Sequence, residues 1–385
     1  MANKNGKRNT SLRGGLKSRR GNLISNSRAN VSRLLRRFTP RNDARQNISI
    51  ILAPFSIGGP NNEAKDGPQA LMSNHLDDDL RELGFNVKVI KPARDLMNYV
   101  SNHKQSNKKN RIKNIEAIVK INEWLAKTVE NEIKSNSLPL TIGGDHSLAI
   151  GTIAGVVAGF SAVGRPALGK KPTTTKDIGV LWIDRHFDAH SPKNTPSWRA
   201  HGMPTAVAIA DKKYDSHPDF QRLLMVGQSK KLPKVKPENL VHFAIGEKSL
   251  VKPKTKWFLM EDIDDYGITK CIEEAVNYLL KRTKKIYIAW DIDSMNVTGT
   301  GTSGDSQLVL REGLVIARTI NKKIRLAGKL AGLELMEVAP KLERKDLKGQ
   351  TVDWSMQLLT TCFGSNLFNL HSHMTRNINM HATDS

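Results

Sequence analysis

The sequence is poor in cysteine and in long apolar runs. Its 385 residues contain two cysteines, Cys271 and Cys362, which are too few for a disulfide framework or a thiolate metal site. A reducing compartment is therefore expected, with both thiols buried as small core residues. No segment reaches the roughly 20 apolar residues that a membrane span needs, so we predict no such span.

Acidic residues are scarce, above all near the N-terminus. Lys and Arg number 60 against 37 acids, a net charge of +23, and residues 1–45 hold 13 of the cations with one acid, Asp43. The segment 1–46 is also rich in Ser and Asn, a composition typical of a mitochondrial transit peptide. We predict a mitochondrial protein, with the cytoplasm as second choice. A nucleic-acid-binding arm and a disordered tail are the alternatives for this segment.

From residue 47 onward, short apolar segments alternate with amphipathic ones. Strands are predicted at 48–52, 86–90, 138–142, in the apolar run from 181, and at 240–245, 256–260, 285–290 and 330–336. Helices are predicted at 68–83, 112–134, from 147, and at 204–211, 268–282, 311–322 and 351–363. This alternation indicates a parallel sheet covered by helices on both faces, which the chain length allows to form one large α/β domain or two smaller ones, followed by a polar tail, 366–385.

Three of the predicted strands lead into possible metal ligands. The run from 181 is followed by Asp184, His186 and Asp188, and strand alternation would place these side chains on one face. The strands at 138–142 and 285–290 lead into further candidates: His146, Asp291 and Asp293. Because ligand sites in parallel sheets lie at the carboxyl ends of the strands, we expect one shared site.

Carboxylates and imidazoles gathered in this way predict a metal centre. Like charges a few ångströms apart disfavour joint ionisation, and two divalent cations would balance four carboxylates. Oxygen and nitrogen ligands without sulfur suit Mn²⁺ or a similar ion, and such a pair activates water for hydrolysis. Each cluster alone could equally be a helix cap or a solvated loop, so the prediction depends on the coincidence of three.

The motifs resemble those of the arginase branch of the ureohydrolase family, with this chain similar to a divergent, fungal-type member. The resemblance spans residues 47–365 and rests on motifs in the family's order: Leu52-Ala53-Pro54-Phe55-Ser56, Gly143-Gly144-Asp145-His146-Ser147, Asp184-x-His186-x-Asp188, His201-Gly202, Asp291-x-Asp293, Leu310-Arg311-Glu312-Gly313-Leu314 and Met336-Glu337-Val338. It implies a three-layer α/β/α sandwich around an eight-stranded parallel sheet, and a homotrimer.

The resemblance also implies a ligand set and a reaction. Two Mn²⁺ per chain would be held by His146, Asp184, His186, Asp188, Asp291 and Asp293, with Asp184 and Asp291 bridging. His201 would shuttle protons, Glu337 would pair with the substrate guanidinium, and Asp188 would complete the catalytic residues. The implied reaction is attack of metal-bound hydroxide on the guanidinium carbon of a small guanidino substrate, which releases urea.

The surroundings of this ligand set depart from the family pattern. His190, Thr195 and Ser197 occupy positions that the resemblance assigns to substrate binding, although His190 replaces an Asn. Arg185 stands between two ligands, where strand alternation would direct it into a packed layer. Trp198 and Arg199 stand where the family's site opens. The acidic loop that binds the substrate's amino group is replaced by a shorter basic segment, 246–253.

These departures leave three hypotheses open. The chain is a mitochondrial Mn²⁺ ureohydrolase acting on arginine or a related guanidino compound, or it keeps the metals for structure only. In the third hypothesis it is a degenerate scaffold that contacts RNA or the mitochondrial ribosome through its N-terminus and its basic inserts, 101–111, 164–175 and 228–236. Complete retention of the six ligands favours the enzyme.

Overall fold

The computed structural model describes residues 45–103, 108–163, 177–210, 216–227, 234–247, 251–302 and 307–365. Within these ranges one sheet has eight strands in the order β2-β1-β3-β8-β7-β4-β5-β6, and every neighbouring pair is parallel. The strands are β1 (Asn47–Ala53), β2 (Asn86–Ile90), β3 (Ser137–Gly143), β4 (Ile178–Ile183), β5 (Leu240–Ile245), β6 (Lys256–Leu259), β7 (Lys285–Asp291) and β8 (Leu330–Met336). The predicted parallel, eight-stranded α/β architecture is confirmed.

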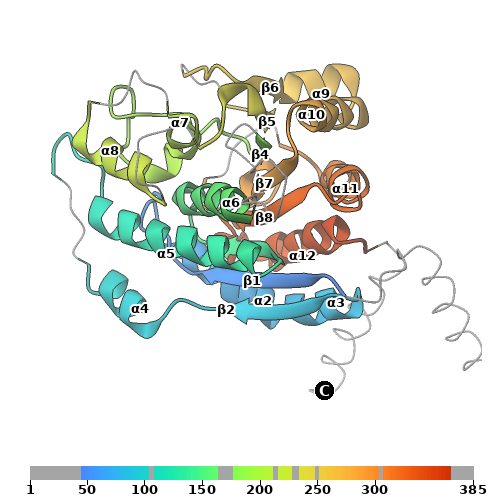
Figure 1. Cartoon of the computed structure of the whole chain (residues 1–385), viewed down its shortest axis with the longest axis horizontal. Helices are drawn as coiled ribbons and strands as arrows, with labels where there is room; N and C mark the ends of the chain where they lie inside the picture. Colours follow the sequence, from blue (N-terminus) through green and yellow to red (C-terminus); the bar gives the residue numbers. More distant parts are fainter. Residues whose placement is uncertain are drawn as a thin grey trace, which may run out of the picture. The chain divides into compact units, whose positions relative to one another are not determined.

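Helices cover both faces of this sheet (Figure 1). One face packs against α4 (Arg94–Ser101), α5 (Ile115–Lys134), α6 (Ala149–Val163) and α7 (Pro204–Ile209), with α8 (Pro218–Met225) outside them. The other packs against α2 (Gly67–Ser73), α3 (Leu76–Glu82), α9 (Met260–Tyr266), α10 (Ile268–Arg282), α11 (Leu310–Thr319) and α12 (Gln350–Cys362). The result is the expected three-layer sandwich. No helix in the described ranges is long and apolar enough to cross a membrane.

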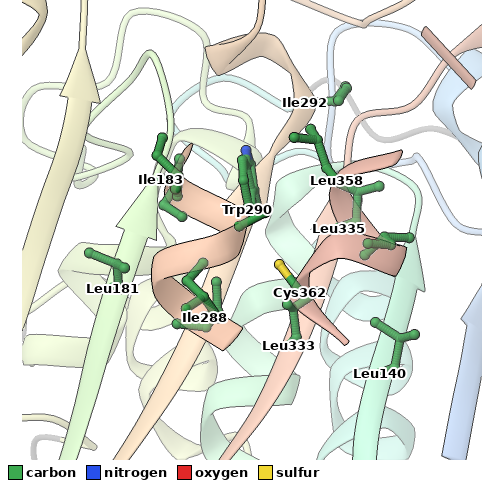
Figure 2. Packing of buried hydrophobic residues seen from close by; sticks show 14 of the residues in the cluster. Leu140, Leu181, Ile183, Ile288, Trp290, Ile292, Leu333, Leu335, Leu358 and Cys362 are labelled. Atoms are coloured by element: carbon green, nitrogen blue, oxygen red, sulfur yellow. The ribbon is translucent and has the colours of Figure 1, made fainter. Parts of the chain in front are cut away.

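The core follows directly from strand alternation. Along β7, Ile288 and Trp290 face the layer of α10 to α12, whereas the intervening Ala289 faces α5 and α6. Figure 2 shows Ile288 and Trp290 beside Leu358 and Cys362 of α12. Cys362 and Cys271 are both buried and free, as predicted for small core residues.

Substitution of Leu358 would measure how much this packing stabilises the fold. It is 1% exposed in the layer between β7, β8 and α12, so Leu358→Ala is expected to lower the free energy of unfolding by about 2–5 kcal/mol through lost burial and a residual cavity. Urea denaturation followed by circular dichroism measures this. Leu326→Ala, at a site 52% exposed, is the control and should change stability by less than about 0.5 kcal/mol.

Two local predictions are wrong, and three short helices were missed. The single helix expected at 68–83 is two helices, because the Asn74 side chain donates to Ala70 O (2.9 Å) and His75 adopts a left-handed conformation (φ 62°). Leu71 and Leu76 are buried on either side of the break. The apolar pattern therefore continues across the break and gives no sign of it. The strand expected at 256–260 ends at residue 259, where α9 begins. The short helices α4, α8 and α9 were not predicted.

Several predictions lie outside the described residues. These concern residues 1–44, the tail 366–385, and most of the basic inserts at 104–107, 164–176 and 228–233. The division of the chain into a basic segment, a catalytic domain and a tail therefore stays a prediction.

A buried lysine lies beside the outer helices of the α5–α8 layer. Lys234 is 1% exposed, and its Nζ donates to Leu224 O (3.1 Å) at α8. Burial lowers the pKa of Lys234 to about 7. The folded chain therefore binds this proton more weakly than the unfolded chain does.

This linkage predicts a rise in stability with pH. Between pH 7 and the unfolded lysine's pKa near 10.5, the unfolded chain binds more protons, so the free energy of unfolding increases with pH in that window. From pH 7 to 9, deprotonation of Lys234 should raise the free energy of unfolding by about 2 kcal/mol. Lys234→Met should lack this increment. Urea denaturation of both proteins across the window measures it, and parallel pH profiles would contradict the burial argument.

Candidate metal centre

The predicted ligands meet at the carboxyl edge of the sheet. His146 begins the short helix η2 (His146–Leu148) just after β3, and Asp184 follows β4. Asp291 ends β7, and Asp293 lies in the next turn, η7 (Ile292–Ser294). In this parallel sheet β8 separates β3 from β7, and β7 adjoins β4, so the three loops emerge side by side.

His146 is the centre of the first group of ligands. Its Nδ1 lies 3.0 Å from Asp184 Oδ2, 3.1 Å from Asp291 Oδ2 and 3.5 Å from Asp188 Oδ2. Nδ1 is buried, yet it makes no hydrogen bond with any described group. The imidazole ring is therefore not oriented toward any single one of these oxygens. Ligand atoms of His146, Asp184 and Asp291 lie within 4.8 Å of one another, with Asp188 beside them, which is an arrangement suited to a cation.

A second group shares Asp184. His186 Nδ1 lies 2.9 Å from Asp293 Oδ2 and 3.5 Å from Asp184 Oδ1, so Asp184 presents one oxygen to each histidine. Both predicted bridging residues also accept a backbone N–H through Oδ1, Asp184 from His186 (2.7 Å) and Asp291 from Asp293 (2.8 Å). The bridging roles stay predictions.

The electrostatics of these residues fit two divalent cations. Burial, followed by the charge of Asp184, raises the pKa of Asp188 well above its usual range. Burial raises the pKa of Asp291 in the same way, followed by the charges of Asp293 and Asp184. Carboxylates packed so closely need compensating positive charge. The donor set and the orphaned Nδ1 therefore fit a binuclear centre.

The loop after β4 does not continue the strand. β4 ends at Ile183, and Asp188 has a left-handed backbone (φ 46°), so the ligands converge through loop geometry and the predicted strand alternation is wrong here. Arg185 is half-buried, with its Nη1 3.3 Å from His186 Nε2, and so lies beside a ligand and outside the packed layer. Alternation fails because the strand ends at Ile183, before the first of the three ligands.

Remote residues hold this loop in place. Phe187 O accepts hydrogen bonds from Thr205 Oγ1 (2.7 Å) and from the ring of His242 (3.0 Å), and Phe187 N donates to Glu247 Oε1 (2.9 Å). Burial lowers the pKa of His242 to about 4, so its ring is neutral and donates through Nε2. Sequence analysis missed these supports, which come from β5 and α7 and carry no local motif.

Trp182 links both histidine groups and was also missed. Its indole stacks on the His146 imidazole, with ring centroids 4.0 Å apart and planes at 11°, and its Nε1 donates to Asp184 Oδ2 (2.9 Å). It therefore fixes the plane of one ligand and one oxygen of another. In sequence it is one apolar residue in a buried strand, which gives no signal for this role.

The predicted catalytic residues lie around the same loops. Glu337 follows β8 with a left-handed backbone (φ 65°), and its Oε1 accepts the backbone N–H of His146 (3.0 Å). His201, in η4 (Ala200–Gly202), donates its backbone N–H to Gly58 O (3.2 Å). Burial, followed by the nearby cations His186 and Arg199, lowers the pKa of His201 to about 3.

The predicted substrate-binding residues form one loop that returns to His201. His190 N donates to Gly202 O (2.9 Å), which closes the loop, and His190 Nδ1 is buried without a partner among the described residues. The hydroxyls of Thr195 and Ser197 accept backbone N–H groups of Trp198 (3.0 Å) and Arg199 (3.3 Å), respectively. Both side chains therefore shape the loop itself.

Trp198 and Arg199 are both tied to neighbouring segments. The Trp198 ring packs 5.5 Å from the ring of His217 at the start of α8, and its carbonyl accepts Lys113 N (2.9 Å). The Arg199 guanidinium donates to Gly59 O in the loop after β1. These contacts join the 190–202 loop to its surroundings at two points.

This fold and donor set define a binuclear metal site at the carboxyl edge of a parallel sheet. The Arginase family model matches residues 46–364. Arginase-1 of Rattus norvegicus is 32% identical over 329 residues, covering 83% of this chain and 93% of the relative. Arginase of Bacillus subtilis is 29% identical over 331 residues (83% and 98%). The solved arginase of Bacillus caldovelox has a TM-score of 0.69 at 27% identity, covering 84% of this chain and 99% of that chain. The chain belongs to the arginase family.

Proposed function

We propose that this protein is a Mn²⁺-dependent ureohydrolase that cleaves a guanidino compound, arginine or a close relative, into an amine and urea. The observation that supports it most strongly is the convergence of two histidines and three aspartates on one edge, in two groups that share Asp184, with Asp188 beside the first group. Family membership adds hydrolysis of a guanidino group to this geometry. When bound, two Mn²⁺ ions would supply Lewis-acid activation of water.

The chain's own residues would orient the substrate and move protons. The family resemblance assigns proton transfer to His201, whose backbone N–H is bonded to Gly58 O. Its pKa of about 3 keeps the imidazole neutral at neutral pH, so it would accept a proton only transiently. Glu337 has one oxygen on His146 N, which places its carboxylate at the ligand edge, where a guanidinium could pair with it. Asp188 would serve as a metal ligand, since its Oδ2 lies 3.5 Å from Nδ1 of His146.

The test is urea release from three guanidino compounds. Full-length protein loaded with Mn²⁺ should release urea from at least one of L-arginine, agmatine and 4-guanidinobutyrate, and chelation should abolish it. The three differ at the end remote from the guanidinium, so their relative rates report which groups the 190–202 loop accepts. No turnover on any of them, together with less than one metal per chain, would overturn the proposal and favour the scaffold hypothesis.

Location and assembly complete the proposal. The basic, acid-poor segment 1–46 supports import into mitochondria. Sequencing the N-terminus of the protein purified from cells tests this, since an intact Met1 or Ala2 would contradict it. The family resemblance supports a homotrimer, which light scattering on the purified protein would distinguish from a monomer.

A further inference from the structure

The second ring nitrogen of His146 faces another buried group. His146 Nε2 lies 3.9 Å from Glu334 Oε1, and both residues are at most 1% exposed. Neither atom has a hydrogen-bond partner among the described residues. A buried polar atom without a partner is unfavourable by about 1–3 kcal/mol, so two that face each other call for an explanation.

The other oxygen of Glu334 is firmly anchored. On β8, Glu334 Oε2 accepts hydrogen bonds from Thr152 Oγ1 of α6 (2.6 Å) and Tyr287 Oη of β7 (2.9 Å). These two donors hold the carboxylate with Oε1 toward the imidazole. On the imidazole side, the stacked Trp182 ring fixes the plane of His146. The two unpartnered atoms are therefore held opposite each other from both sides.

The chemistry of ligation requires one tautomer of His146. Its Nδ1 faces the carboxylates, so it binds a cation only when its lone pair is free and the ring proton is on Nε2. A carboxylate opposite Nε2 accepts that proton's hydrogen bond and favours this tautomer. The gap of 3.9 Å is about 1 Å longer than a hydrogen bond, a distance that small side-chain rotations can close.

We propose that Glu334 is a positioning residue that accepts the Nε2–H of His146 and so keeps Nδ1 free for the metal. The role rests on the proposed metal centre, and it concerns metal affinity and ring tautomer only. Because Glu334 faces His146 and not His186, it acts on one of the two metal positions.

Glu334→Gln tests this with the same side-chain shape. A glutamine can still accept from Thr152 and Tyr287 through its oxygen, but it then presents N–H donors to His146 Nε2 and favours the wrong tautomer. Mn²⁺ affinity at the His146 position should fall 10- to 100-fold, while the His186 position changes by less than about threefold. Calorimetric titration of metal-free protein measures both, and ¹⁵N shifts of the labelled histidine rings report the tautomer.

Glu132→Gln is the matched control. Glu132 is another buried carboxylate, bonded to Ser49 Oγ (2.6 Å) and Lys88 Nζ (2.8 Å) away from the metal ligands, so its substitution should leave both affinities and the tautomer of His146 unchanged. Wild-type affinity in Glu334→Gln, or an equal loss at both positions with the Nε2–H tautomer kept, would overturn the proposal. So would a wild-type chain that binds no Mn²⁺. A chain that binds two Mn²⁺ but releases no urea would refute the proposed reaction and leave the role of Glu334 standing.

Discussion

Asp184→Asn is expected to abolish binding of both metal ions and, with it, urea release. Asp184 is fully buried and presents Oδ2 to His146 (3.0 Å) and Oδ1 to His186 (3.5 Å), so among the described residues it is the carboxylate shared by both histidine groups. An asparagine has one acceptor oxygen and no charge. Loss of a residue that only supports a metal ligand typically costs 10- to 100-fold in affinity, so loss of a shared ligand should cost about 100-fold or more.

The same substitution should also destabilise the metal-free chain. Although burial opposes it, contacts with His146 and His186 lower the pKa of Asp184 below its usual range, so the folded chain favours the ionised carboxylate at neutral pH. Asparagine keeps an acceptor for Trp182 Nε1 but loses these two ion pairs. Thermal unfolding should therefore show a lower melting temperature for the variant than for chelated wild type. Added Mn²⁺ should raise it for wild type only, since a ligand stabilises the state that binds it.

Metal content by elemental analysis completes this experiment. Wild type should hold two ions per chain and Asp184→Asn fewer than one. Asp346→Asn, at an exposed ion pair with Arg344, is the control and should bind metal as wild type does. Two ions retained by Asp184→Asn would show that Asp184 is not the shared ligand. A metal-free variant that melts at or above chelated wild type would contradict the stabilising role of its contacts with His146 and His186.

The sequence predicted the sheet well because parallel strands are buried on both faces. The ranges 240–245 and 330–336 agree at both ends with β5 and β8, which are buried throughout, and the helix 268–282 agrees with α10. The edge strand β2 also agrees with its range, 86–90, although its residues are exposed or half-buried. Buried strands are continuous apolar runs bounded by polar turns, so their limits are visible locally. The break at Asn74 and His75 was missed because a side-chain bond ended the helix while the apolar spacing continued.

The ligands could be predicted, but not the way in which they are held. Their residue types and their positions after strands were sufficient, since any parallel sheet brings such loops to one edge. The turn that brings Asp188 inward depends on Thr205 and His242, which are distant in sequence and share no motif with it. Glu334 and Trp182 were likewise indistinguishable from core positions. Supporting contacts of this kind depend on tertiary packing, which one sequence does not show.

Gly144→Ala is expected to disrupt the same edge through the backbone. A Cβ on Gly144 would overlap the carbonyl oxygen of Phe55 and lie 2.5 Å from its carbonyl carbon, and that oxygen accepts the N–H of Asp145 (3.1 Å). No side-chain rotation relieves a collision with backbone, so the loop after β3 must move. We expect a loss of about 3 kcal/mol in the free energy of unfolding.

Mn²⁺ affinity should fall together with stability in this variant, because His146 lies two residues beyond the collision and a shift of its Nδ1 breaks the first ligand group. Gly84→Ala separates this effect from the general effect of adding a methyl group to a glycine. Nothing lies within 4 Å of a Cβ at Gly84, but its φ of +95° makes alanine strained, so about 1 kcal/mol should be lost with metal affinity unchanged. Urea denaturation and Mn²⁺ titration of both variants measure the difference. Equal losses of stability, or a Gly144→Ala protein with wild-type affinity, would show that the loop after β3 can move without moving the ligand.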